Sequence, residues 1–213
     1  MEERNAWNQV YLEYGENVPW ATEPELNRWY IQTLSKYLTA PKNKTLLDYG
    51  CGLGQVAEHF RQIGYQIELA DLSEVVVKKL NEKYQNKVPV YLVKTPNDIS
   101  KENAYDVILA IGVFHHLNPD NWASFLNDFY KLLKKDGIVF VAGWDKADKE
   151  IRNVQKSLFT HLSRWSVNDL PKYVNQGQFE IMADDTAEIK YNSLSFLRTM
   201  HYFVLKKKYE EVK

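Results

Sequence analysis

Apolar residues follow two spacings along this chain, and the change between them divides the chain into segments. They first recur every three or four positions over residues 7–14, which is the spacing of one helix face. Residues 26–38 repeat that spacing and stop just before Pro41, where a helix is expected to end. The chain is therefore predicted to begin with two amphipathic helices.

From residue 45 onward, short apolar runs typical of strands alternate with helical spacing. The predicted strands cover residues 45–49, 66–70, 88–93, 106–111 and 138–142. Predicted helices separate them over residues 54–63, directly after Ser73, and over residues 122–133. Ser73 is placed to cap the second of these helices, which is expected to turn Val76, Val77 and Leu80 inward. This alternation predicts an α/β fold built on a parallel sheet.

Beyond residue 142 the pattern changes. Residues 151–162 and 167–174 have helical spacing, whereas residues 179–189 and 201–205 have the composition of strands. Two strands joined by a short connection favour an antiparallel pair, because parallel strands need a long crossover. We expect this pair to close one edge of the sheet.

The length of 213 residues fits one α/β domain with a modest cap. We expect an N-terminal helical cap over residues 1–40 and the main domain over residues 41–213, within a single structural domain. The 45% share of apolar residues is enough for a full core. The single cysteine, Cys51, excludes an internal disulfide and suits a reducing compartment.

Charge and hydropathy narrow the range of partners. The net charge of −1 gives no electrostatic footprint for nucleic acid. No run of about 18 apolar residues is present, and the first residues lack the features of a signal peptide. We therefore expect a cytoplasmic protein with no nucleic-acid or membrane partner, and the sequence leaves its oligomeric state open.

The first predicted strand ends in the run Asp-Tyr-Gly-Cys-Gly-Leu-Gly at residues 48–54. Gly50, Gly52 and Gly54 make a turn in which no side chain blocks the approach of a ligand. A helix follows at once, and ligands of open α/β sheets bind at the carboxyl ends of strands. This turn is therefore a candidate ligand site.

The glycine spacing separates two classes of nucleotide-binding protein. A dinucleotide fingerprint, G-x-G-x-x-G, needs a third glycine where this chain has Ala57. Asp48 would also repel a pyrophosphate, whereas it tolerates a ligand that carries an ammonium group. Both features disfavour an NAD(P)-binding Rossmann oxidoreductase, which is nevertheless kept as the main alternative.

The run at residues 48–54 resembles the nucleotide loop of the class I S-adenosylmethionine-dependent methyltransferases, D-x-G-C-G-x-G. The resemblance covers residues 45–143 by motif and the remainder by element order. It implies a Rossmann-like, seven-stranded, mostly parallel sheet with helices on both faces, an antiparallel last strand beside the fifth, and an N-terminal helical lid. It also implies S-adenosylmethionine as cofactor, S-adenosylhomocysteine as product, and in-line methyl transfer to O, N or S of a small-molecule acceptor. A non-catalytic S-adenosylmethionine-binding protein is a further alternative.

The resemblance implies cofactor contacts from the glycine loop itself. They fall on Asp48, Gly50, Cys51 and Gly52, and Cys51 is expected to act through its backbone rather than its thiol.

A second acid ends the second predicted strand. Asp71 lies 23 residues beyond Asp48, near the separation at which an acid binds a ribose in nucleotide-binding βαβ units. Its carboxylate is expected to accept both ribose hydroxyls. The alternative role, capping the next helix, is one that Ser73 already fits. In the resembled family the following residue, here Leu72, often packs on the adenine.

The resembled family usually has an acid for the adenine amino group after the third strand. The simplest alignment places Pro96 there, and proline has neither a side-chain acceptor nor a backbone donor. Asn97 or Asp98 serves instead if the loop shifts by a residue or two. The end of the fourth strand, at Ile111, is expected to pass the methionine part of the cofactor.

A histidine pair follows the fourth strand. His115 and His116 resemble the variant found in many small-molecule methyltransferases, and Ile111 and Gly112 exclude the D/N-P-P motif used on planar amino groups. One of the two is a candidate general base, because an imidazole titrates near neutral pH. The alternative is that a histidine packs under the next helix. No metal is expected, since neighbours on extended chain point apart.

The remaining candidates concern the acceptor. Trp144 follows the fifth strand and is expected in the substrate wall. Tyr11, Tyr14 and Trp20 precede the sheet and are candidates to close over the methionine tail or the acceptor. The alternative for each of these three is a place in the core.

Overall fold

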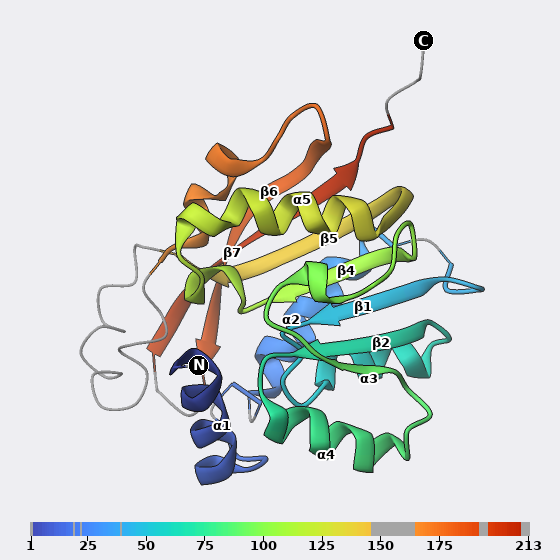
Figure 1. The fold of residues 1–213 in the computed structure, drawn as a ribbon. Helices are drawn as coiled ribbons and strands as arrows, with labels where there is room; N and C mark the ends of the chain where they lie inside the picture. Colours follow the sequence, from blue (N-terminus) through green and yellow to red (C-terminus); the bar gives the residue numbers. More distant parts are fainter. Residues whose placement is uncertain are drawn as a thin grey trace. The chain divides into compact units, whose positions relative to one another are not determined.

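Seven strands follow the order β3-β2-β1-β4-β5-β7-β6 in this computed structural model (Figure 1). The structure describes residues 2–18, 20–21, 23–38, 40–145, 165–191 and 196–209. The chain divides into two compact units. The first comprises Met1–Ser100 with Lys190–Phe196, and the second comprises Lys101–Ile189 with Leu197–Lys213.

The first unit contains three parallel strands. They are β1 (Thr45–Tyr49), β2 (Gln66–Asp71) and β3 (Val90–Leu92). β1 pairs in parallel with β2, and β2 with β3, so that Asp48 lies beside Leu69. Leu46 and Leu47 are fully buried, as expected of a strand covered on both faces.

Helices of the first unit connect and flank these strands. They are α1 (Glu2–Tyr14), α2 (Pro24–Ser35), α3 (Gln55–Gln62) and α4 (Glu74–Tyr84), with the 3₁₀ turn η1 (Pro96–Asp98) after β3. α1 runs beside α4 (Figure 1). The Ser73 hydroxyl donates to the Asn8 side-chain oxygen at 2.8 Å, and the Arg4 guanidinium lies 3.4 Å from the Glu74 carboxylate. The N-terminal helix is thus attached to the start of α4.

The second unit contains four strands with mixed directions. They are β4 (Tyr105–Ile111), β5 (Leu133–Trp144), β6 (Phe179–Tyr191) and β7 (Phe196–Lys207). β4 and β5 are parallel, whereas β7 is antiparallel to β5 and lies between β5 and β6. The seven strands, the antiparallel last strand and its place beside the fifth confirm the predicted fold class.

Helical elements of the second unit follow β4 and β5. They are η2 (Phe114–His116), η3 (Pro119–Asn121), α5 (Trp122–Leu132) and η4 (Val167–Tyr173). Figure 1 shows α5 along β5, and the two elements are in contact. Phe114 is fully buried and makes edge contacts with Trp122 and Phe125 of α5. This aromatic group fixes η2, which carries the histidine pair, to α5.

Three predicted details differ from the structure. Residues 135–137, which separate the predicted helix over residues 122–133 from the predicted strand over residues 138–142, lie within β5, and the pairing of β4 with β5 shifts register between Tyr105 and Val107 at that end. Val77, expected to face inward, is only half-buried because it lies at the edge of the apolar face of α4. The helix predicted over residues 167–174 is the 3₁₀ helix η4, Val167–Tyr173, which tolerates Pro171. The helix predicted over residues 151–162 lies outside the described residues.

Candidate functional site

The glycine turn after β1 is attached to the end of β2 by its backbone. The amides of Gly50 and Cys51 both donate to the Ala70 carbonyl, at 2.8 and 3.1 Å. Gly50, Gly52 and Gly54 have φ values of +70°, +52° and +70°. These left-handed conformations favour glycine, which explains the motif in terms of backbone geometry.

Asp71 joins this turn to the helix that follows β2. One carboxylate oxygen accepts the Gly52 amide and the other accepts the Ser73 amide, both at 2.9 Å. The hydroxyl of Ser73 caps α4 by accepting the Val76 amide at 3.3 Å. Burial raises the pKa of Asp71, whereas its backbone donors Ser73, Gly52 and Leu72 lower it. An ionised carboxylate has about four acceptor sites, so these donors leave capacity for a ligand.

A second acid lies close to Asp71. Asp48 is buried and accepts the backbone amide of Ala57 in α3. Burial and the charge of Asp71 together raise the pKa of Asp48 to about 7, although the Ala57 amide acts in the opposite direction. Two neighbouring buried acids favour a cationic ligand, because its charge would compensate their desolvation.

Cys51 contributes no activated thiol to this place. Its sulfur donates weakly to the Gly52 carbonyl at 3.5 Å. Burial, with the charges of Asp71 and Asp48, raises the pKa of Cys51 well above its ordinary value. A thiol in this setting is a poor nucleophile.

Aromatic residues from the N-terminal segment lie over the glycine turn. A Cβ atom at Gly52 would be 2.8 Å from the hydroxyl oxygen of Tyr11 and 3.9 Å from the indole nitrogen of Trp20. The rings of Tyr11 and Trp20 meet edge to face at 6.1 Å, and Trp7 meets Trp20 at 5.8 Å. Burial and the charge of Asp71 raise the pKa of Tyr11, so its hydroxyl stays protonated.

Tyr14, which was also predicted at this site, is half-buried and hydrogen-bonds its neighbour Glu13.

The residues expected around the adenine lie after β2 and β3. Leu72 is half-buried directly after Asp71. Asn97 and Asp98 are both exposed in η1. The carboxylate of Asp98 accepts the amides of Lys94 and Thr95 at 2.6 and 2.8 Å, so it stabilises its own turn.

The histidine pair lies in the second unit, after β4. His115 is 3% exposed and His116 is half-buried. Their rings are 4.0 Å apart, because η2 is a 3₁₀ turn and not the extended chain that was expected. The ring of His115 stacks on the indole of Trp144 at 4.7 Å, with 14° between the planes. The structure thus brings together three of the predicted residues of this unit, while Ile111 ends β4 half-buried.

Further polar residues hold the chain on either side of Trp144. The Asn168 amide donates to the Asp145 carboxylate at 3.0 Å, and the Ser166 hydroxyl donates to the Trp144 carbonyl at 3.4 Å. The backbone amide of Trp165 donates to the His115 carbonyl at 3.3 Å. The sequence interpretation missed these contacts, since they join residues 22 to 50 positions apart and no local spacing marks them.

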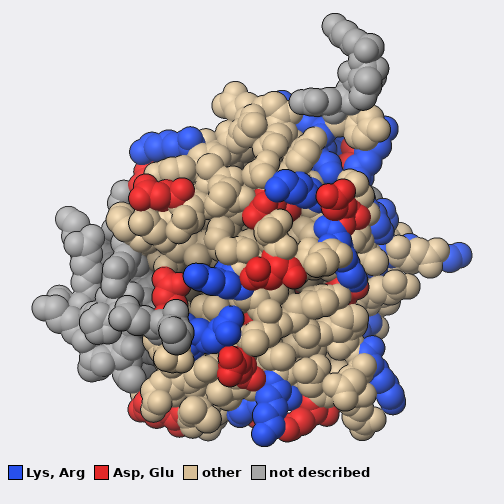
Figure 2. All heavy atoms as spheres, in the orientation of Figure 1, with Lys and Arg blue, Asp and Glu red and all other residues tan. Residues whose placement is uncertain are grey.

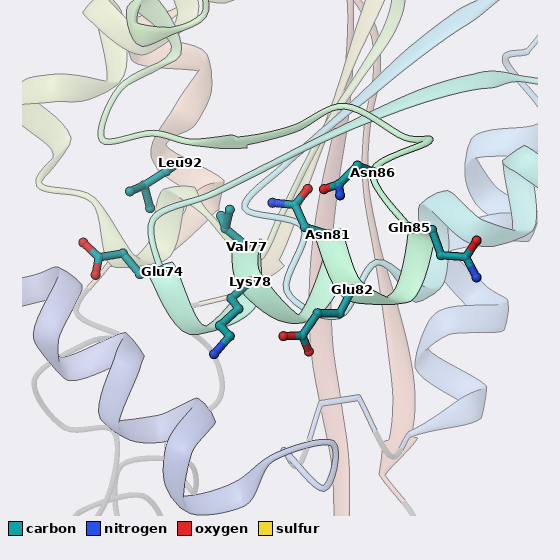
Figure 3. Close-up of a pocket in the computed structure, with 8 residues that line it drawn as sticks. All are labelled: Glu74, Val77, Lys78, Asn81, Glu82, Gln85, Asn86 and Leu92. Carbon is teal, nitrogen blue, oxygen red and sulfur yellow. The ribbon is translucent and has the colours of Figure 1, made fainter.

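A surface hollow of about 450 Å³ lies on α4 (Figure 3). Val77, Lys78 and Asn81 line it, with Leu92 from the end of β3. None of the predicted site residues lines this hollow. It is therefore separate from the candidate ligand site of the first unit.

Three further observations concern the described part of the chain. No group of three or more His, Cys, Asp or Glu side chains in it is arranged to hold a metal ion. No helix within the described ranges is long and apolar enough to cross a membrane. On the face drawn in Figure 2, basic and acidic side chains are intermixed and do not form a patch of one sign.

A family model for the methyltransferase domain matches residues 20–184. A ubiquinone biosynthesis O-methyltransferase from Pelagibacter ubique is 35% identical over 111 residues, which cover 51% of this chain and 45% of that protein. The chain spans about half the length of the curated relatives it matches.

Solved structures with the same fold cover nearly the whole chain. The N-methyltransferase NodS from Bradyrhizobium japonicum, in complex with S-adenosylhomocysteine, matches with a TM-score of 0.72 and 11% identity, over 96% of this chain and all of NodS. A didemethyltoxoflavin N-methyltransferase from Burkholderia thailandensis, also bound to S-adenosylhomocysteine, matches with a TM-score of 0.71 and 17% identity, over 98% and 90% of the two chains.

Proposed function

The chain belongs to the methyltransferase-domain family, among the class I S-adenosylmethionine-dependent methyltransferases, and from this premise we propose that it methylates an oxygen atom of a small planar acceptor. The observation that carries the proposal is the glycine turn joined to the buried carboxylate of Asp71. It combines a close backbone approach with an acceptor for ligand hydroxyls.

The residues of the first unit fit S-adenosylmethionine. We assign the ribose hydroxyls to Asp71 and the adenine to Leu72, with Asn97 for the adenine amino group because Asp98 serves its own turn. Asp48, Gly50, Cys51 and Gly52 bound the part of the site that would receive the methionine portion. When bound, the cofactor supplies a methyl group that is activated on a positively charged sulfonium. The protein binds and orients the cofactor and the acceptor, and it excludes water from them.

We propose Trp144 and His115 as one wall of the acceptor site. Their stacked rings make a flat surface, and flat aromatic surfaces suit a planar acceptor. An oxygen acceptor agrees with the names of the relatives, which are O-methyltransferases. Ile111 at the end of β4 is assigned to the methionine portion of the cofactor.

We propose that His116 is the general base that takes the proton of the acceptor hydroxyl. This residue is half-buried, whereas its neighbour His115 is almost fully buried against Trp144. A base must reach the proton that it removes, so the more accessible ring is the better placed. The base is needed only because a hydroxyl, unlike an amine or thiolate, must lose a proton on methylation.

We propose that residues 1–40 act as a cap over the cofactor-binding turn. Tyr11 is 4% exposed and Trp20 meets its ring edge to face, both directly over Gly52. A ligand in this turn would therefore lie beneath aromatic side chains, which would shield a sulfonium from water. Tyr14 is kept as a candidate at the edge of this cap.

The function is tested by methyl transfer itself. Purified protein is incubated with S-adenosylmethionine carrying a radiolabelled methyl group and with catechol, a primary amine or a thiol. The proposal expects label in the catechol product, and more of it than in the other two. Label in the amine or thiol alone would contradict the oxygen assignment. Binding of S-adenosylhomocysteine without transfer to any acceptor would favour the non-catalytic alternative.

A further inference from the structure

The imidazole of His115 lies against two glycines at the ends of neighbouring strands. Ile111 of β4 pairs with Ala142 of β5, so the next residues, Gly112 and Gly143, lie side by side. The Gly112 amide donates to the Ala142 carbonyl at 2.8 Å, which holds the two chain segments together at this point. The glycines form the floor of a notch that the ring of His115 fills.

One edge of the ring faces into this notch. The His115 Nδ1 atom would be 2.8 Å from a Cβ atom at Gly143, and its Cε1 atom would be 3.6 Å from one at Gly112. Real Cβ contacts shorter than about 3 Å are not tolerated, because packed atoms repel steeply at that distance. Any side chain at Gly143 would therefore displace the imidazole.

The need for glycine at position 143 arises from side-chain space. Unlike Gly112, which has a φ of +71°, Gly143 is the last residue but one of β5, and its φ is not positive. A glycine within a strand weakens it and marks close approach of another group. The groups that approach are His115 and Val167, whose Cγ1 atom would lie 2.6 Å from a Cβ at position 143.

The geometry points to Gly143 as a positioning residue for the acceptor wall, an inference that rests on the proposed function. By leaving space for the imidazole edge, Gly143 allows His115 to lie parallel to the indole of Trp144, its own neighbour in the chain. Without that space the ring would move away from the strand and the stacked wall would be lost. Gly143 touches no reactant and acts through His115.

The primary test is spectroscopic. In protein with labelled histidine, NMR detects the His115 ring protons, which the stacked indole shifts upfield. Gly143→Ala should abolish this shift, and so should Gly143→Ala combined with Val167→Ala, where the valine clash is relieved but the histidine clash remains. Val167→Ala alone and Gly177→Ala, a turn glycine, should keep it. A wild-type shift in the Gly143→Ala/Val167→Ala protein would overturn the inference.

The second test separates acceptor binding from cofactor binding. Gly143→Ala should raise the KM for catechol by roughly 10-fold, the scale of an altered pocket contact, while S-adenosylhomocysteine affinity stays within about twofold. In a His115→Ala/Val167→Ala background, where neither clashing side chain remains, the same change should add no further loss, since Gly143 acts through the His115 ring. An equal loss in both backgrounds would contradict this route. If wild-type protein methylates nothing, the proposed function fails, and the NMR result still decides the role of Gly143.

Discussion

The hydroxyl oxygen of Tyr11 lies 2.8 Å from the position that a Cβ atom at Gly52 would occupy. This contact joins the N-terminal helix to the glycine turn across 41 residues of chain. It places an aromatic side chain directly over the backbone that the proposed cofactor must approach. The contact therefore links the proposed cap to the proposed cofactor site within the first unit.

We predict that Gly52→Val abolishes S-adenosylhomocysteine binding. The side chain would collide with Tyr11, and a φ of +52° is strained for a β-branched residue. Calorimetric titration measures the effect. In the milder Gly52→Ala variant, an added Tyr11→Phe change removes the clashing oxygen and should restore part of the affinity. Wild-type binding by Gly52→Val would show that the site is misassigned.

We predict that Asp48→Asn flattens the dependence of stability on pH. Burial raises the pKa of Asp48 to about 7, whereas an unfolded aspartate titrates near 4. Between these values the folded state holds a proton that the unfolded state has released, so stability falls as the pH rises from about 4 to about 7.

Asparagine cannot ionise, and its side-chain oxygen can still accept the Ala57 amide. Over this pH range the wild-type protein should lose at most about 4 kcal/mol of its free energy of unfolding, the upper limit for a pKa shift of about three units. The variant should not show this loss. Urea unfolding at several pH values measures this loss. The exposed residue Asp120, changed to asparagine, serves as the control. An unchanged slope in Asp48→Asn would contradict the assignment of the buried proton.

We predict that His116→Ala lowers turnover by about 10²–10⁴, the range for loss of a general base, with cofactor affinity nearly unchanged. Steady-state kinetics with catechol measure this. His116→Gln, which keeps hydrogen bonding but cannot take the proton, should be as slow. His115→Ala should mainly raise the KM for the acceptor. If both alanine variants keep wild-type kcat, the acceptor reacts without a protein base.

We predict that removing residues 1–20 leaves the protein folded but inactive. Val10, Tyr11 and Val18 of this segment are buried, so its removal should lower the melting temperature. Turnover should be lost because the cap no longer excludes water from the cofactor. Circular dichroism and the radiolabel assay measure the two effects. Full activity of the shortened chain would contradict the role of the cap.

Local patterns predicted the glycine turn after β1 well, because its backbone geometry depends on neighbouring residues. The backbone dihedrals at positions 50, 52 and 54 require glycine. The place of Asp71 at the end of β2 could be predicted because the apolar run that forms this strand ends there. The spacing of apolar residues likewise gave the order of the elements. Val77 was misplaced because it lies at the boundary of the apolar face of its helix.

Contacts between distant segments were not accessible in the same way. The stack of His115 on Trp144 joins residues 29 positions apart, and it depends on a 3₁₀ turn that no apolar spacing marks. Gly143 lies one residue beyond the strand predicted over residues 138–142, so its place in β5 and its neighbours could be named only from the structure.

The most direct test of the account is a pair of calorimetric titrations with S-adenosylhomocysteine and NAD⁺. We predict that the wild-type protein binds S-adenosylhomocysteine at one site and does not bind NAD⁺. Asp71→Ala should weaken that binding by roughly 1.5–3 kcal/mol, the scale of hydrogen bonds to a charged group. Glu68→Ala, an acid of the same strand that accepts the Tyr91 hydroxyl, should leave it unchanged. Binding of NAD⁺ with no heat from S-adenosylhomocysteine would contradict the account.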